Sequence, residues 1–158
     1  MKTKAIIHPD ELTKKWIDRA IAQDINVIAL HSVGNKEAHI NLANDLSIFE
    51  SSDFKSLVDY ANSNGIEIEY ELHAISYLLP RELFNDHPEY FRVDGDGNRN
   101  PFSNLCVSNE EMTAEFTKKV IELIAANPDH EYIHLGQEDT GTYCTCAKCS
   151  ETAKTYKN

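Results

Sequence analysis

Acidic side chains follow an apolar run in the last quarter of this 158-residue chain. Gln137, Glu138 and Asp139 come directly after residues 132–136, which are typical of a strand. Glycoside hydrolysis needs an acid to protonate the departing oxygen and a second group to stabilise the oxocarbenium-like centre. Adjacent residues point in different directions, so Glu138 and Asp139 can take different roles in catalysis or sugar binding. A solvated acidic loop is the alternative interpretation.

Histidines accompany each of the four expected strands. His8, His31 and His73 end the first three, and His134 lies within the fourth. The carboxyl ends of parallel strands share one face, where α/β enzymes build their active sites, so these imidazoles are expected to converge. His73 and His134 are the stronger functional candidates because each shares a strand face with nearby acids. For His8 and His31 alone, a surface or strand-capping role is the alternative.

The cysteines predict a second site beside the acids. Cys144, Cys146 and Cys149 form C-x-C-x2-C after the fourth strand, and Cys106 ends the loop after the third. Loops of adjacent units are neighbours in space, so four thiolates could complete a closed, tetrahedral structural zinc site. Disulfides and free thiols stay open as alternatives, although a C-x-C pair closes into a strained disulfide ring.

One segment resembles a calcium-binding loop only in part. Asp94, Asp96 and Asn98 imitate the start of an EF-hand loop, but Arg99 replaces its glycine and Leu105 its bidentate glutamate. The segment is therefore predicted to be a turn.

The elements that position these residues alternate between strand and helix. Strands are expected at 4–8, 26–31, 66–73 and 132–136, and helices at about 12–23, 53–64, 109–127 and from 147, with Asp53 and Ser108 as amino-terminal caps. The third strand alternates, placing Glu67, Glu69 and Glu71 on a face expected to be solvated, which would line the lumen of a barrel.

Four strand–helix units in a row predict an α/β fold with parallel strands and right-handed crossovers. A small doubly wound sheet would be complete at this length, whereas a (β/α)8 barrel needs about 250 residues. No glycine-rich nucleotide motif follows the first strand, so no organic cofactor is expected. We therefore predict a partial TIM barrel, with residues 1–158 forming one half-barrel domain of about four βα units.

The composition argues against two classes of binding partner. A formal net charge of −11 argues against a nucleic-acid or anionic membrane partner, because both require clustered Lys and Arg. The amino-terminal apolar run is too short for a signal sequence, and no stretch approaches the roughly 18 apolar residues of a membrane span. A soluble chain is expected, and its compartment stays open, including a secreted or periplasmic parent protein.

Three blocks of sequence carry a family resemblance. They are LLPRELFNDHPEYFRVDGDGNRN, NLCVSNEE and IHLGQEDTGTYCTCAKC, and with the intervening residues they cover about half of the chain, from His73 to Cys149. This arrangement resembles the DUF4838 group, counted as glycoside hydrolase family 163. HLGQED is also similar, more distantly, to the HxGGDE strand end of the family 20 β-hexosaminidases, although the order of acid types is reversed.

The resemblance implies a (β/α)8 barrel that cleaves N-acetylglucosamine linkages in complex N-glycans by a retaining, acetamide-assisted mechanism. It implies that Glu138 orients the acetamide and Asp139 is the acid/base. It also implies a sugar site lined by His73 and a shared structural role for Cys106, Cys144, Cys146 and Cys149. His134, His31 and Gln137 are further substrate-binding candidates because of their places at the strand ends. Zinc is the metal expected at the cysteines because of their spacing.

The chain is shorter than such a barrel. Strands five to eight would supply the rest of the sugar pocket, so the piece alone is expected to be inactive and to pair with the missing half or with a second copy. The alternatives are a non-catalytic, metal-stabilised carbohydrate-binding or interaction module, and a redox or metallochaperone protein that uses an exposed thiolate.

Overall fold

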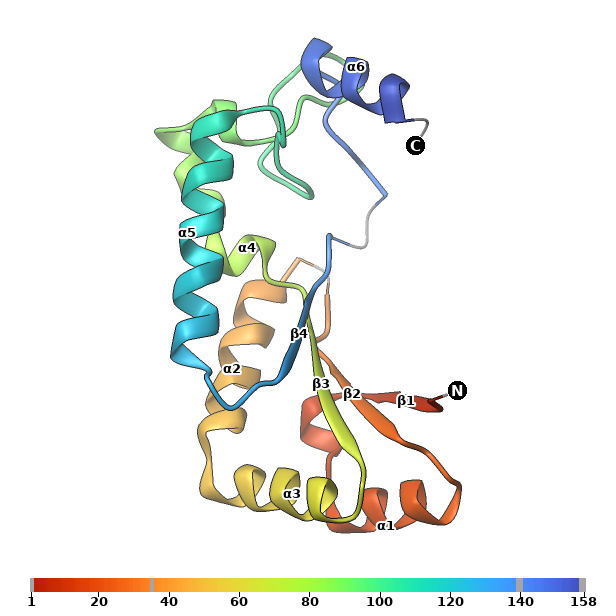
Figure 1. The fold of residues 1–158 in the computed structure, drawn as a ribbon. Coiled ribbons are helices and arrows are strands. Elements are labelled where there is room, and N and C mark those ends of the chain that lie inside the picture. The colour runs from red at the N-terminus through yellow and green to blue at the C-terminus, as the bar shows by residue number, and fades with distance from the viewer. Residues whose placement is uncertain (1, 35, 139–140, 157–158) are drawn as a thin grey trace. The chain divides into compact units, whose positions relative to one another are not determined.

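Two compact units make up the chain in the computed structural model, which describes residues 2–34, 36–138 and 141–156 (Figure 1). The first unit comprises Met1–Ala74 and Asn127–Gly136, and the second comprises Ile75–Ala126 and Gln137–Asn158. The chain therefore passes from the first unit to the second just after two of its strands end. The assignment of residues 1–158 to a single half-barrel domain stays a prediction.

A four-stranded parallel sheet forms the centre of the first unit. Its strands are β1 (Lys4–Ile7), β2 (Val27–His31), β3 (Glu67–Leu72) and β4 (Tyr132–Leu135), and they lie in the order β1-β2-β3-β4 (Figure 1). Sequential neighbours joined by helices are the arrangement of a barrel wall. The predicted α/β class with consecutive parallel strands is thus confirmed, and it is consistent with a partial barrel.

Strand alternation divides the sheet into an apolar and a polar face. Ile28, Leu30, Tyr70 and Leu72 point to one face and are at most 2% exposed. Helices α1 (Lys14–Ala22), α2 (Ala38–Glu50) and α3 (Ser52–Ser63) belong to this unit, and Phe49 of α2 packs edge-on against Tyr70 with ring centroids 4.9 Å apart. Residues of opposite parity, including the three glutamates of β3, lie on the other face.

Two local expectations for this unit were wrong. Helix α2 was not predicted, because its apolar residues surround the helix instead of forming one stripe, and Ile40 is 50% exposed. The cap of α3 is Ser51, whose Oγ accepts the Phe54 N–H at 3.2 Å, while Asp53 lies in the first turn. Asp53 still suits that position because a carboxylate is favourable near the amino end of a helix.

The second unit contains α4 (Ile75–Leu78), α5 (Glu110–Ala126), α6 (Ala147–Tyr156) and the 3-10 turns Arg81–Asn85 and Pro88–Tyr90. A further 3-10 turn, Pro9–Glu11, belongs to the first unit. The core of the second unit consists of Leu79, Tyr90, Phe91, Leu105 and Met112. Through these residues the segment between α4 and α5 packs against α5.

Helix α5 is capped by Asn109, whose Oδ1 accepts the Met112 N–H at 2.8 Å, and not by Ser108 as expected. None of the helices in the described part of the chain is both long and apolar enough to cross a membrane.

Candidate functional site

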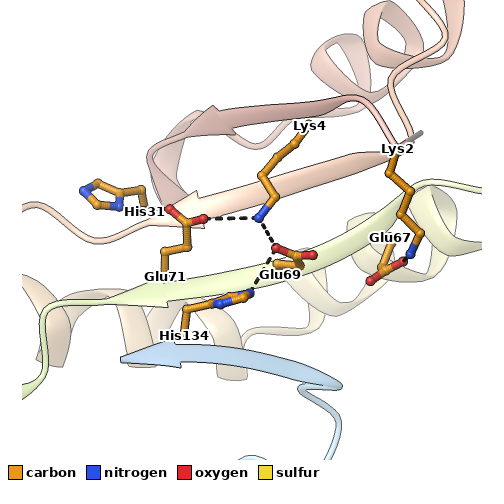
Figure 2. Close-up of polar contacts among 7 residues, drawn as sticks. All are labelled: Lys2, Lys4, His31, Glu67, Glu69, Glu71 and His134. Carbon is orange, nitrogen blue, oxygen red and sulfur yellow. Dashed lines mark hydrogen bonds and ion pairs between the residues drawn. The ribbon is translucent and has the colours of Figure 1, made fainter. Parts of the chain in front are cut away.

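The polar face of the sheet is a network of ion pairs (Figure 2). Lys4 contacts Glu69 and, at 3.4 Å, Glu71, while His134 Nε2 lies 3.1 Å from Glu69 Oε2. Lys2 pairs with Glu67 in the same way. The hydrogen bond from Lys4 holds the pKa of Glu69 below its ordinary value, and Glu69 in turn raises the pKa of Lys4. The predicted solvated face is thus a face on which each acid of β3 has a basic partner.

His31 and His73 meet at the carboxyl ends of β2 and β3. Their Nε2 atoms are 3.4 Å apart, and their rings are nearly perpendicular with centroids separated by 5.0 Å. His31 Nδ1 lies 3.3 Å from Glu71 Oε2, its register partner on β3. His73 is buried, with 5% of the residue exposed, whereas 36% of the His31 side chain is exposed.

His8 and His134 take different places on the same face. His8 follows β1, and its Nδ1 lies 2.9 Å from the His31 carbonyl oxygen, with the two ring centroids 6.5 Å apart. His134 is turned to Glu69 and has a half-exposed side chain. The expected convergence therefore holds for His8, His31 and His73, and His134 joins the ion-pair network instead.

Glu138 is a buried acid in the second unit. It is 3% exposed, and its Oε1 has no hydrogen-bond partner among the described residues. Its N–H donates to Asn104 Oδ1 at 3.2 Å, and Asn104 Nδ2 donates to the Thr142 carbonyl at 2.9 Å. Asn104 therefore holds both ends of the segment that carries the acids.

The backbone beside Asn104 is strained. Ser103 has a φ of 78°, a conformation that L side chains rarely adopt, and its Oγ donates to the Thr142 carbonyl at 3.2 Å. The Thr142 hydroxyl donates back to Ser103 Oγ at 2.6 Å. Sequence reasoning gave neither residue a role, because the signal is the meeting of two loops far apart in the chain.

Gln137 and Asp139 are the residues on either side of Glu138. Gln137 is exposed, and its Nε2 donates to the Tyr143 hydroxyl at 2.9 Å. Asp139, the expected acid/base, lies outside the described residues.

Four thiols cluster in the second unit. The sulfur atoms of Cys106, Cys144, Cys146 and Cys149 all lie within 4.8 Å of one another, and none of the four is in a disulfide. Cys106 Sγ is 3.7 Å from Cys146 Sγ and 3.9 Å from Cys149 Sγ. Ligands about 2.3 Å from a tetrahedral zinc ion are separated by about 3.8 Å, so the spacing fits a zinc site with four thiolate ligands. The cluster could hold a metal ion.

Polar groups surround the cluster and would stabilise thiolates. The Val93 N–H donates to Cys144 Sγ at 3.2 Å, and Ser108 Oγ lies 3.0 Å from Cys149 Sγ. Burial lowers the pKa of Arg99, but interactions with Cys106 and its neighbours outweigh this effect and raise it. A guanidinium at this place would offset the excess negative charge of four thiolates on one divalent ion.

The thiols are unequal as proton donors. Burial raises the pKa of Cys144 to about 12. Burial also acts to raise the pKa of Cys146, but hydrogen bonds, first from the Cys149 backbone, outweigh it and lower the value to about 7. Neither Arg99 nor Val93 was expected at this site. The Asp94 segment beside them is a turn, as predicted, in which Asp94 Oδ1 accepts the Asp96 and Asn98 N–H groups at 3.1 and 2.9 Å.

A comparison with protein families decides the relationship. Residues 15–158 match the domain of unknown function DUF4838. The chain belongs to this family. The sequence blocks that contain Asn104, Glu138 and the cysteines therefore lie inside the region that matches DUF4838. No curated protein matches the chain at a significant level.

Solved structures with a similar fold include β-galactosidases. The enzyme from Bacillus circulans sp. alkalophilus superposes with a TM-score of 0.52 at 14% identity over 99% of this chain. Those from Marinomonas ef1 and Rahnella sp. R3 both give 0.50 at 17% identity, over 84% and 99% of it. The chain spans only 24%, 20% and 24% of these three proteins. At such identities the likeness concerns the fold.

Proposed function

We propose that this DUF4838 chain is part of a glycoside hydrolase that cleaves β-N-acetylglucosamine linkages by a retaining, acetamide-assisted mechanism. The observation that carries the proposal is Glu138, a buried carboxylate just after β4 whose Oε1 has no hydrogen-bond partner among the described residues. A buried polar atom without a partner costs free energy, so it is retained where a ligand supplies the missing hydrogen bond.

The chemistry of a carboxylate matches one part of the substrate. An ionised carboxylate only accepts hydrogen bonds, and the acetamide of N-acetylglucosamine offers an N–H. In an acetamide-assisted reaction that N–H must be held while the acetamide oxygen attacks the anomeric carbon. Glu138 would hold it and favour the positive charge that develops there. Asp139, the next residue, would protonate the departing oxygen and later activate water.

Residues at the strand ends would bind the rest of the sugar. We assign His73, His31, His134 and Gln137 to this role because imidazoles and amides can both donate to and accept from hydroxyl groups. The fold likeness to β-galactosidases supports a carbohydrate ligand. The likeness covers about a quarter of those enzymes, so we infer that further strands complete the pocket. They would pair with β1 and β4, the outer strands of the described sheet, and would come from a longer chain or a second copy.

A non-catalytic alternative is favoured by the cysteine cluster. Four thiols at tetrahedral spacing could stabilise a carbohydrate-binding module without any use of the acids as catalysts. We assign zinc to this cluster in both proposals, because thiolate ligands in tetrahedral geometry are typical of that metal.

Hydrolysis assays on the full-length natural protein that contains this chain would test the assignment. Chromogenic β-N-acetylglucosaminide and β-galactoside substrates are compared for the wild type and for Asp139→Asn, Glu138→Gln and the exposed control Glu131→Gln. The first two variants should lose about 10²–10⁴-fold in kcat on the N-acetylglucosaminide, and the control should not. Unchanged turnover in Asp139→Asn would show that the acid/base is wrongly assigned. Chitobiose binding without hydrolysis in the wild type would support the module.

A further inference from the structure

The paired imidazoles at the ends of β2 and β3 have the geometry of metal ligands. His31 Nε2 and His73 Nε2 are 3.4 Å apart. Two nitrogen ligands, each about 2.0–2.1 Å from a tetrahedral zinc ion, are separated by about 3.3–3.4 Å. We propose that His31 and His73 bind a divalent transition metal ion through their Nε2 atoms, at a site separate from the four thiols.

The second nitrogen of His31 is held as metal sites require. Its Nδ1 lies 3.3 Å from Glu71 Oε2, and a carboxylate can only accept a hydrogen bond. The proton of a neutral His31 ring is therefore on Nδ1, and its Nε2 accepts the hydrogen bond from His73 Nε2. A metal ion would replace the proton between these two nitrogens. A carboxylate behind a ligating histidine orients the ring and strengthens its nitrogen as a ligand.

The backbone fixes this arrangement before any metal binds. His31 and Glu71 are register partners on adjacent parallel strands, and the Ser32 N–H donates to the Glu71 carbonyl at 2.9 Å. His73 is 5% exposed, so its ring is held by packing. Little side-chain entropy would then be lost on binding, because two of the groups involved are already placed.

His8 is a neighbour and not a third ligand in this geometry. Its ring centroid is 6.5 Å from that of His31, against 5.0 Å between His31 and His73, and its Nδ1 lies 2.9 Å from the His31 carbonyl oxygen. With two protein ligands the site keeps open positions, which water or a hydroxyl oxygen of the sugar would fill. His31 and His73 would then contact the sugar through the metal ion and not by direct hydrogen bonds. Imidazole ligands suit Zn²⁺, Ni²⁺ and Cu²⁺.

The network on the polar face limits which residues can take part. His134 is bonded to Glu69, and Glu69 is also paired with Lys4, so these groups already have partners within the network. Glu71 has a contact with Lys4 at 3.4 Å as well as with His31, and it therefore serves as a support for the ring more than as a direct ligand.

His87 offers a matched control within the same chain. Its Nδ1 lies 3.1 Å from Glu89 Oε1, which repeats the carboxylate–imidazole pair of Glu71 and His31. Its ring stacks on Tyr90 with centroids 4.6 Å apart, so an aromatic ring takes the place that His73 has beside His31. A response shared by both histidines would reflect weak carboxylate–imidazole affinity for metal and not the proposed pair.

The test is a Zn²⁺ titration of the ¹⁵N-labelled chain followed by long-range imidazole NMR. The first equivalent saturates the thiols, and the spectra are then followed through the second. We expect the Nε2 signals of His31 and His73 to shift together at a stoichiometry of one ion, with the Nδ1 proton retained on His31. The signals of His87 should not move. This readout does not depend on hydrolysis, so it is independent of the proposed function.

Variants separate binding from folding. Glu71→Gln keeps the shape of the side chain and should weaken the second Zn²⁺ about 10–100-fold, whereas His31→Gln should abolish its saturable binding. His87→Gln should bind it as the wild type does. Backbone spectra identify any variant that has lost the fold. Imidazole signals of His31 and His73 that stay in place at saturating Zn²⁺, or an unchanged second equivalent in folded His31→Gln, would overturn the proposal.

Discussion

The two donor clusters of this chain differ in how completely the protein surrounds them. The thiol cluster of the second unit gathers four sulfur atoms within 4.8 Å, with Cys106 and Cys149 buried. The strand-end cluster of the first unit brings two imidazoles together, and one of them is partly exposed. A closed set of ligands stabilises a fold, while an open set leaves room for a ligand. On this basis we propose a structural role for the thiols and a ligand-binding role for the strand ends.

The largest effect is expected from breaking the closed cluster. Cys149→Ala should lose the zinc ion that we propose for this cluster and unfold the second unit, with a loss on the order of several kcal/mol, because structural zinc contributes directly to folding. Hydrogen exchange would show lost protection in α5 and α6, while β2 and β3 stay protected. Ser150→Ala, at the next residue, is the control and should keep its metal. Retained protection of the second unit in metal-free Cys149→Ala would remove the structural role.

A core substitution probes the first unit without touching the thiols. Leu30 is fully buried in β2, and Leu30→Ala should cost about 2–5 kcal/mol of unfolding free energy because it leaves a cavity. Denaturant unfolding measures this loss, and the zinc content should equal that of the wild type. Ile6→Ala, at a 60% exposed position of β1, should change stability by less than about 0.5 kcal/mol. Equal losses in both variants would contradict the two-faced sheet.

The smallest effect concerns the polar face. Lys4 lowers the pKa of Glu69 in the folded chain, so this pair stabilises the fold above the ordinary carboxyl pKa of 4.5. That contribution is lost as the pH falls through the lower, folded pKa. Glu69→Gln should cost about 0.2–1 kcal/mol at pH 7, and this cost should shrink as the pH falls toward 2. Urea unfolding across this range measures the difference, and an effect that persists at pH 2 would point to packing instead of charge.

The sequence predicts the strands better than the contacts between them. All four strands were expected within about one residue of their observed ends, because short apolar runs between turns are distinctive. Helix α2 was missed because its apolar residues do not follow one stripe. The thiol cluster was predicted from the spacing of three cysteines. Arg99 and Asn104 were not expected at their sites, since contacts between loops far apart in the chain leave no periodic signal.

The pairing of His31 with Glu71 shows why register matters for function. The pattern of each strand predicts which side chains share a face, but only the alignment of β2 with β3 brings these two side chains opposite each other. Sequence reasoning therefore placed the histidines at one edge of the sheet and could not select His31 and His73 as the pair. Asp139, expected as the acid/base, stays a prediction.

One NMR titration tests the division between a ligand-binding edge and a structural cluster most directly. The zinc-loaded, ¹⁵N-labelled full-length natural protein that contains this chain is titrated with chitobiose, with lactose as the comparison sugar. The account predicts saturable shifts of the Glu138 amide and the His31 and His73 imidazoles with chitobiose, weaker shifts with lactose, and none at Cys106 or Cys149. Shifts confined to the thiol cluster, or no saturable shift of Glu138 with chitobiose, would contradict it.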